Sequence, residues 1–460
     1  MFYSSPLPYT TDAANCYAAI ADLPWAVWLD SAGKGRYDIL CAQPVATLIT
    51  HGDRTEIIDD DGMRCSSDDP FALLRRQLGE PVAGMPDIPF AGGALGYCGY
   101  DLARRMMKLP EQAVQEGGGP DMAMGIYDWA IVFDHQQKSA QLVSQQRYAI
   151  TRKQLPEILD RLCMAEKSPA DTFRVQGDVC SNFTPDSYAA AFAQVKSYLL
   201  AGDCYQVNLA QRFSAAASGD ALGAYLALRR LSPAPYSAFL NLPQTQILCA
   251  SPERFLRVQN GSVETKPIKG TRPRSSDAQL DRQLAEELCK HPKDRAENLM
   301  IVDLLRNDLG KSCMAGSVRV PKLFEVESYA NVHHLVSTVE GRLASGRHAL
   351  DVLRDCFPGG SVTGAPKQRA MQIIEQLEPH RRGIYCGAIA YIGFDGNMDS
   401  NIVIRTLVYA ENEIFCWAGG GIVADSEVDA EYQETLDKAS AMLKLLQQYG
   451  GKYDCLAQGR

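Results

Sequence analysis

Two acidic segments of the chain carry side chains that could bind a divalent cation. Within residues 427–446, Glu431, Glu434 and Lys438 follow one another at steps of three or four residues, so a helix would place them on one face. Glu297 lies in a second predicted helix that is apolar around much of its circumference. Because Mg²⁺ usually takes one or two carboxylates plus water and substrate oxygens, two glutamates from separate helices would suffice. The alternatives are a solvated acidic stripe on the later helix and a capping box that includes Glu297.

Arg405 is a cation inside an otherwise apolar segment, residues 400–410, which we predict to be one strand. In that strand Arg405 would share a face with Val403 and Leu407. A buried arginine needs a partner, and its planar fork fits a carboxylate. The functional interpretation is a grip on an acidic substrate, and the alternative is an internal salt bridge or an edge residue that extends to solvent.

Two glycine-rich runs lie next to predicted helices. Residues 358–367 lead into a helix predicted over 366–377, and the free N–H groups at such a start can bind an anion. Residues 419–421 are three consecutive glycines, which would let a ligand approach the backbone closely. For the first run the alternative is an ordinary capped helix start.

A basic segment, residues 266–274, contains four cations in nine residues. Taken alone it would pass for an exposed basic loop. A lysine in it could instead act as a nucleophile, but only if its surroundings favour the neutral amine.

Predicted elements point to an α+β class, with two large antiparallel β-sheets packed as a sandwich-like core, helices outside and a central active-site cleft. Short strands separated by turn residues dominate the first part of the chain. Helices are predicted at 184–202, 294–309, 366–377 and 427–446, and further strands at 204–213, 237–258, 384–393, 400–410 and 413–419. We divide the chain into an N-terminal region (1–165), a polar linker (166–182) and a second region (183–450) packed intimately with the first.

Composition excludes several classes of function. The net charge is −9 with no long block of one sign, which argues against a nucleic-acid binder. No stretch approaches 18 uninterrupted apolar residues, so we expect no membrane span, and the first residues do not read as a secretory leader. The 14 cysteines form no C-x-x-C pairs, which is typical of reduced thiols in a cytoplasmic protein.

Six motifs occur in an order that resembles the chorismate-utilising enzymes. They are PIKGTRPR (267–274), DRAENLMIVDLLRNDLG (294–310), HHLVSTVEG (333–341), FPGGSVTGAPKQRAMQIIEQLEP (357–379), IRT (404–406) and GGGIVADSEVDAEYQETLDKA (419–439). The match covers about residues 184–447. Since six motifs keep their register over more than half of the chain, we identify the chain as a member of this family.

The resemblance implies a magnesium-dependent site. Lys269 would be the nucleophile and Glu253 the general acid. Mg²⁺ would be bound by Glu297 and Glu434, with Glu431 assisting. The residues implied to surround the substrate are Arg405, Tyr385, Ser361, Thr363, His334, Lys438 and the backbone of Gly419, Gly420 and Gly421.

Lys269 also indicates the branch of the family. Members that form anthranilate typically have alanine at this position, whereas lysine is typical of members that aminate C4 of chorismate on the route to 4-aminobenzoate and folate. The alternatives are an anthranilate-forming enzyme, an isochorismate synthase, and a non-catalytic subunit that binds tryptophan or scaffolds a glutaminase.

Partners follow from the same resemblance. A triad glutaminase would show a G-x-C-x-G turn, and Cys98 in GYCGY does not fit it. We therefore expect a separate glutamine amidotransferase subunit, in a heterodimer, to supply ammonia for chorismate. The resemblance further implies an L-tryptophan pocket built by Ser31, Arg36, Tyr37, Pro235, Tyr236 and Ser237.

Overall fold

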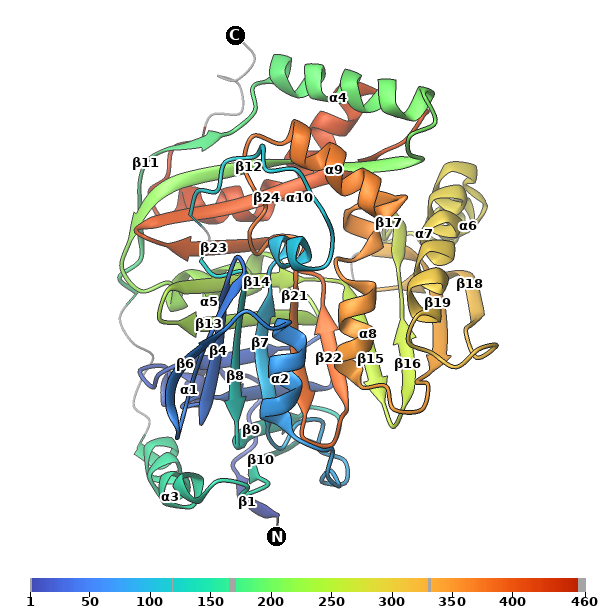
Figure 1. Ribbon diagram of the computed structural model, residues 1–460. Coiled ribbons are helices and arrows are strands. Elements are labelled where there is room, and N and C mark those ends of the chain that lie inside the picture. The colour runs from blue at the N-terminus through green and yellow to red at the C-terminus, as the bar shows by residue number, and fades with distance from the viewer. Residues whose placement is uncertain (1, 118, 165–170, 330–331, 454–460) are drawn as a thin grey trace.

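Two large antiparallel sheets form the centre of the computed structural model, which describes residues 2–117, 119–164, 171–329 and 332–453. We call them sheet A and sheet B, and each has twelve strands among the described residues. In Figure 1 most strands of sheet A run across the view, while those of sheet B run up and down. The predicted α+β class with two antiparallel sheets is confirmed.

Strand order shows how the sheets are built. Sheet A has the order β1 (Tyr3–Leu7), β10 (Ser139–Ser144), β9 (Trp129–Asp134), β3 (Tyr37–Cys41), β2 (Ala26–Asp30), β13 (Tyr236–Leu242), β14 (Thr245–Ser251), β23 (Thr406–Ala410), β24 (Glu413–Ile422), β12 (Gln206–Ser218) and β11 (Arg174–Ser181), with β20 (Gly364–Ala365) beside β12. Sheet B has the order β17 (Ile268–Pro273), β19 (Val332–Arg342), β16 (Ser262–Thr265), β15 (Arg254–Gln259), β22 (Met398–Asn401), β21 (Ala388–Gly393), β7 (Gly93–Cys98), β8 (Met122–Tyr127), β4 (Ala46–His51), β5 (Arg54–Asp59) and β6 (Gly62–Ser66), with β18 (Arg319–Ser328) beside β19.

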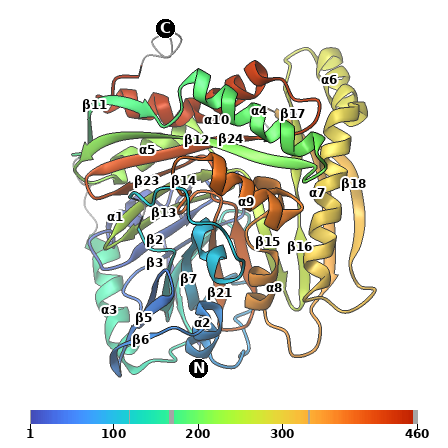
Figure 2. The same ribbon diagram turned by 45° about the horizontal axis from the view of Figure 1, so that its top comes forward.

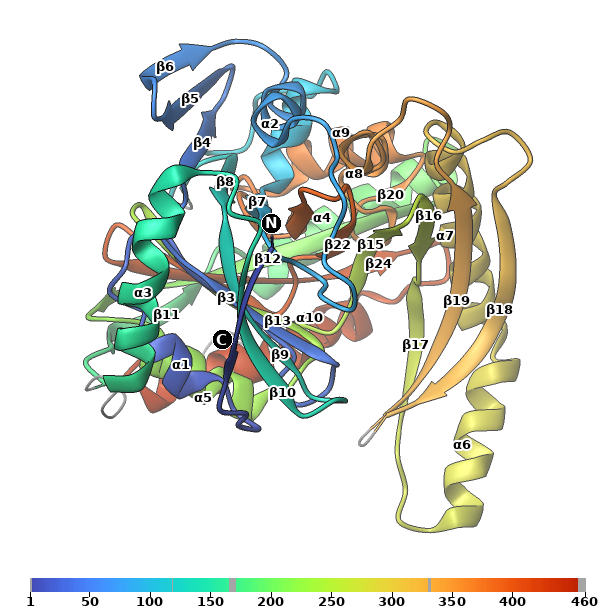
Figure 3. The same cartoon turned by 90° about the horizontal axis from the view of Figure 1, so that it is seen from below.

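Helices lie outside the sheets. They are α1 (Ala14–Ala18), α2 (Pro70–Leu78), α3 (Ala149–Met164), α4 (Pro185–Leu200), α5 (Leu222–Leu231), α6 (Ala278–Lys290), α7 (Pro292–Gly310), α8 (Ala349–Cys356), α9 (Lys367–Leu377) and α10 (Val428–Gln448), with short 3₁₀ turns η1 (Tyr100–Arg105) and η2 (Gly360–Val362). Figure 2 shows α4 and α10 over β12 and β24, and Figure 3 shows α6 beside the outer strands β17 to β19. None of the helices in the described ranges is long and apolar enough to cross a membrane.

The main hydrophobic core lies between the two sheets. Val27 and Ile247 of sheet A pack in the same cluster as Leu95 and Met124 of sheet B, and all four are fully buried. Burial of such side chains stabilises the fold by about 1.5–3 kcal/mol each. The two sheets therefore pack as one sandwich.

Both sheets take strands from each of the two predicted regions. Sheet A pairs β2 with β13, and sheet B pairs β7 with β21. Part of the predicted linker forms β11, which pairs with β12 at the edge of sheet A. Other linker positions, residues 166–170, lie outside the described residues.

The chain crosses from one sheet to the other at two neighbouring places that matter for the site. One crossover joins β14 to β15 and contains Glu253, and the other joins β22 to β23 and contains Arg405. The two run side by side, because Ile402 N donates to Glu253 O (3.1 Å) and Ala250 N donates to Arg405 O (3.1 Å).

The single strand predicted over 400–410 is therefore wrong. Residues 402–405 leave sheet B and enter sheet A, and Arg405 adopts a left-handed backbone with φ 51°. A chain that passes from one sheet to the other needs such a bend. The apolar pattern continues on both sides of the bend, so the sequence pattern does not indicate it.

Candidate active site

Lys269 and Glu253 meet across Ser361. The Lys269 ammonium donates to the carbonyl oxygen of Ser361 (3.4 Å), and the Ser361 hydroxyl donates to Glu253 Oε1 (3.1 Å). Lys269 lies half-buried on β17, Ser361 lies in η2, and Glu253 is only 8% exposed in its crossover. Two segments that are near each other in the sequence thus meet at one residue of a distant third segment, the amine at the carbonyl oxygen of Ser361 and the carboxyl group at its hydroxyl.

The surroundings of these two groups shift their pKa values in opposite directions. Burial lowers the pKa of Lys269, and Lys438 lowers it further, against the opposing effects of Glu297 and Glu253. Burial raises the pKa of Glu253, although Lys269 and the Ser361 hydroxyl oppose this. Both shifts favour the neutral forms, which are a nucleophilic amine and an acid that can donate a proton.

Two acidic helices converge near Lys269. Glu297 of α7 and Glu431 of α10 both face the ammonium of Lys293, whose Nζ lies 3.9 Å from Glu297 and 4.0 Å from Glu431. Burial raises the pKa of Glu297, and Glu431 adds to this effect. Glu297 and Glu431, from two separate helices, therefore lie in one acidic cluster.

Strand β24 approaches this cluster through its three glycines, residues 419–421. These glycines lie inside β24 and not after a strand as predicted. A Cβ added at Gly420 would lie 2.8 Å from Glu431 Oε2 and 3.5 Å from Glu434 Oε1. Lys438 pairs with Glu434 (2.6 Å) and donates to the carbonyl oxygen of Gly419 (2.9 Å). Burial alone would raise the pKa of Glu434, but Lys438 outweighs it and the pKa is lowered. A side chain at residue 420 would therefore push on the carboxylate of Glu431, which glycine leaves in place.

The donor set of this cluster fits a hard cation. It consists of carboxylate oxygens on α7 and α10, which are the ligands that Mg²⁺ prefers. Within the ranges that the structure describes, no three His, Cys, Asp or Glu side chains gather closely enough to hold a metal by themselves. The cluster therefore suits an ion that takes its remaining ligands from a substrate and water.

Arg405 and His334 are two further predicted site residues that lie near each other. Arg405 is exposed, and its guanidinium has no ion pair within 4.0 Å among the described residues. Loss of surrounding water lowers the pKa of Arg405, and Glu253 opposes this. Burial also lowers the pKa of His334, and Arg405 lowers it further, which places the two side chains near each other.

The adjacent histidines point to opposite sides of β19. His333 bonds Ser328 (2.8 Å) and Asp281 (3.0 Å), whereas His334 bonds Thr271 (2.9 Å) on β17. Only His334 lies on the side of the candidate site.

Two of the predicted substrate-binding residues are engaged in packing. Tyr385 is 4% exposed, and its ring stacks on Trp417 with a centroid distance of 6.0 Å. Thr363 is fully buried, and its hydroxyl donates to the carbonyl oxygens of Gly359 and Gly360 within its own loop. Contact of these two side chains with a substrate stays a prediction.

The alternative of a capping box that includes Glu297 is wrong. The cap of α7 is His291, whose ring accepts from Asp294 N (3.4 Å), so Glu297 belongs to no capping box. Arg272 pairs with Glu287 (3.1 Å) and Asp294 (3.4 Å), so the cation that lowers the pKa of Lys269 is Lys438.

Lys293 and Gln206 were not predicted from the sequence. Gln206 is fully buried, and neither atom of its amide has a hydrogen-bond partner among the described residues. A Cβ added at Gly421 would lie 2.9 Å from its Nε2, so the amide lies beside the glycine strand. The available signal was a glutamine two residues before Asn208, which places two polar side chains on one face of an apolar strand.

The six residues predicted for tryptophan come from β3, β13 and the loops beside β2, β3 and β13. They are Ser31, Arg36, Tyr37, Pro235, Tyr236 and Ser237. The Ser31 hydroxyl is buried without a partner in the described part of the chain. Arg36 is already paired with Asp134 (2.7 Å) and lies 4.6 Å over the Tyr37 ring. The ligand itself stays a prediction.

Comparisons with known proteins show the family of the chain. The profile of the chorismate binding enzyme family matches residues 25–444, and the chain belongs to that family. It is 49% identical over 449 residues to aminodeoxychorismate synthase component 1 of Escherichia coli (strain K12), with 96% of this chain and 98% of that protein covered. It is 38% identical to anthranilate synthase component 1 of Thermus thermophilus, with 94% and 95% covered.

A solved structure has the same fold. Anthranilate synthase component I from Streptococcus pneumoniae TIGR4 superposes with a TM-score of 0.80 at 34% identity, over 89% of this chain and 92% of that one. The two-sheet sandwich is therefore the fold of anthranilate synthase component I.

Proposed function

We propose that this protein is the chorismate-aminating subunit of an aminodeoxychorismate synthase. It would convert chorismate and ammonia to 4-amino-4-deoxychorismate, on the route to 4-aminobenzoate and folate, in the cytoplasm. The observation that carries the proposal is the contact of Lys269 and Glu253 across Ser361, with the pKa of the amine lowered and the pKa of the acid raised.

Lys269 begins the proposed reaction. Its neutral Nζ attacks C2 of chorismate, both conjugated ring double bonds shift through C1, C6 and C5, and the hydroxyl group on C4 leaves. A lysine at its usual pKa is neutral in only about one of 2,500 molecules at pH 7. Burial and Lys438 reduce this penalty, because both lower the pKa of Lys269.

Glu253 supplies the proton for the leaving group. Hydroxide is a poor leaving group, and a protonated Glu253 lets it depart as water. Ammonia then attacks C4, both ring double bonds shift back, and the C2–Nζ bond breaks to release Lys269 as a neutral amine. The amino group loses its extra proton to Glu253, which restores the acid.

The remaining residues hold a substrate that carries two carboxylates. Arg405 is exposed and unpaired among the described residues, so its fork is available to one carboxylate. Glu297 and Glu434, with Glu431 assisting, would hold Mg²⁺, which when bound would neutralise these acids and grip the ring carboxylate. Lys438 and the backbone of β24 complete that side of the site.

A second component would deliver the ammonia. The relatives named above are each called component 1, which implies a partner component. We propose that the partner is a glutamine amidotransferase and that free ammonium replaces it at high concentration and pH. Tryptophan binding at the six residues around β2 and β13 belongs to the same proposal and would be measured by calorimetry.

Product analysis tests the proposed function. The purified chain is incubated with chorismate, Mg²⁺ and ammonium, and the product is identified by mass and by its conversion to 4-aminobenzoate with an added lyase. Fluorescent anthranilate that forms without the lyase would replace the proposal with the anthranilate-forming alternative. The lysine at residue 269 is the feature that favours the C4 product.

A further inference from the structure

Ser426 connects the acidic cluster to the outer surface of the molecule. It is 3% exposed and lies in the turn between β24 and α10. Its hydroxyl donates to Glu431 Oε1 (2.6 Å) and accepts from Val423 N (3.1 Å). The hydroxyl proton is therefore committed to Glu431, and the backbone of the turn fixes the hydroxyl itself.

Glu431 is held from a second direction as well. Its other oxygen, Oε2, lies against the backbone of Gly420, where an added Cβ would be only 2.8 Å away. The side chain of Glu431 is 5% exposed, so it has little room to change its rotamer. Ser426 and Gly420 together fix the direction of this carboxylate.

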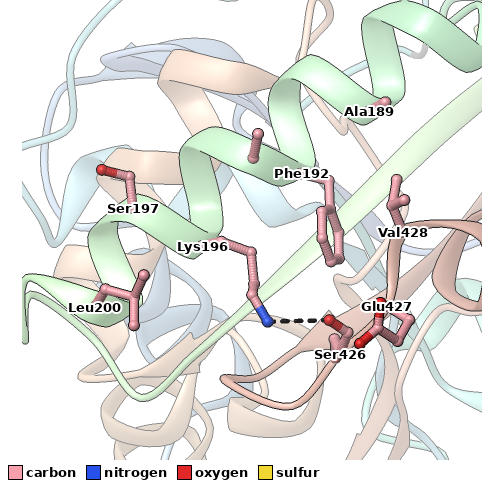
Figure 4. A pocket seen from close by; sticks show the side chains of 9 residues that line it. Ala189, Phe192, Lys196, Ser197, Leu200, Ser426, Glu427 and Val428 are labelled. Atoms are coloured by element: carbon pink, nitrogen blue, oxygen red, sulfur yellow. Dashed lines mark hydrogen bonds between the residues drawn. The ribbon is translucent and has the colours of Figure 1, made fainter.

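Lys196 of α4 fixes the turn from outside. Its ammonium donates to the carbonyl oxygens of Ser426 (3.0 Å) and Ala424. Figure 4 shows Lys196 reaching from α4 to the turn beside a cavity of about 640 Å³, which is also lined by Phe192, Ser197, Leu200 and Glu427. A charge-assisted bond to two carbonyl groups of a five-residue turn restrains the turn strongly.

We propose that Ser426 and Lys196 are positioning residues that hold Glu431 in the orientation a divalent cation needs. The inference rests on the proposed function, because it assigns a task to residues behind one of the proposed ligands. Partners behind a metal ligand orient it and typically change metal affinity by about 10–100-fold when they are removed. Here Ser426 acts on Glu431 directly, and Lys196 acts through the turn.

Metal binding by the whole purified chain tests the proposal without any turnover. The paramagnetic resonance of free Mn²⁺ measures its dissociation constant. We expect Ser426→Ala to weaken Mn²⁺ binding by about 10–100-fold. Lys196→Met should weaken it less, by roughly threefold to tenfold, and Lys196→Arg should restore it because a guanidinium also reaches two carbonyl oxygens.

Ser197→Ala is the matched control, since Ser197 neighbours Lys196 and lines the same cavity. It should bind Mn²⁺ as the wild type does. Saturating Mg²⁺ should also restore most of the amination rate of Ser426→Ala, whereas a general loss of structure would not respond to the metal. Should Ser426→Ala fail to fold, Lys196→Met and Lys196→Arg decide the question alone.

The outcomes separate the inference from the proposed function. Wild-type Mn²⁺ affinity in Ser426→Ala, or in Lys196→Met when Ser426→Ala does not fold, would overturn the positioning role and leave the proposed reaction intact. A wild-type chain that binds no Mn²⁺, with or without chorismate, would remove the metal from the proposed function and this inference with it.

Discussion

Two regions of the molecule each contain a lysine and an arginine, and they differ in whether these cations form ion pairs. Around α9, Lys367 pairs with Asp308 (2.7 Å) and Arg382 pairs with Glu378 (2.7 Å), and both cations are buried. Near the two crossovers between the sheets, neither Lys269 nor Arg405 forms an ion pair with a carboxylate in the described chain.

The pKa values of the two arginines show the consequence. Burial alone would lower the pKa of Arg382, but Glu378 outweighs it and the pKa is raised. Arg405 has only the weaker opposition of Glu253, and its pKa is lowered. Breaking a buried ion pair is costly because it leaves an uncompensated charge, whereas a cation without a protein partner can serve another task. We infer that this task at the crossovers is to bind and react with an anion.

The largest effect on the rate is expected from the substitution of Lys269. Lys269→Ala should lower the amination rate with ammonium by at least about 10³-fold, because no other amine replaces the nucleophile. Chorismate affinity should change by less than about tenfold, or roughly 1.4 kcal/mol. Steady-state rates and calorimetric binding of chorismate measure the two effects. A rate within tenfold of the wild type would rule out the covalent step.

The paired arginine should behave in the reverse manner. Arg382→Met should lower the free energy of unfolding by about 3–5 kcal/mol, because it leaves Glu378 as an uncompensated buried charge. The double change of Arg382→Met with Glu378→Leu should recover part of this loss. Urea unfolding measures both. A stable single variant would show that the pair is not structural.

Arg405 should lose binding rather than stability. Arg405→Met should raise the KM for chorismate by about 30–100-fold, or roughly 2–3 kcal/mol, because one substrate carboxylate loses its fork. The free energy of unfolding should change by less than about 0.5 kcal/mol, since no protein partner is left unpaired. Arg405→Lys keeps the charge but not the planar guanidinium, so its KM should lie between those of the wild type and Arg405→Met. A KM unchanged in Arg405→Met would contradict this assignment.

The sequence predicted the local parts of this arrangement well. Thr184 caps α4 in a capping box with Ser187, as expected from a threonine before proline. Glu431, Glu434 and Lys438 share a helix face, because the helical period fixes that spacing. Such features depend on residues within one or two turns of each other.

The non-local parts could not be read from residue patterns. Residues 92 and 108 positions apart bring Lys269 and Glu253 to Ser361, and only the family resemblance linked them. Alternation of apolar residues does not say which sheet a strand joins, so the bend at Arg405 was missed. Helix α6 was also missed, since most of its side chains are exposed and it has only a narrow apolar face.

Lys438 should give the smallest effect and the finest test of the electrostatics. It lowers the pKa of both Lys269 and Glu253, so Lys438→Met should raise both. Activity requires a neutral Lys269, which sets the rise of the rate with pH, and a protonated Glu253, which sets the fall at higher pH. Both limbs of the profile should therefore move to higher pH together.

The change in rate at pH 7 should be less than about tenfold, because the Lys438 side chain is 43% exposed and solvent screens its charge. Rates measured between pH 6 and 10 at two salt concentrations test this, with the wild-type shift on adding salt expected in the same direction. Lys438→Arg keeps the charge and should leave the limbs in place. Limbs that move in opposite directions, or only one that moves, would show that Lys438 acts through Glu434 or the backbone of Gly419 instead of through its charge.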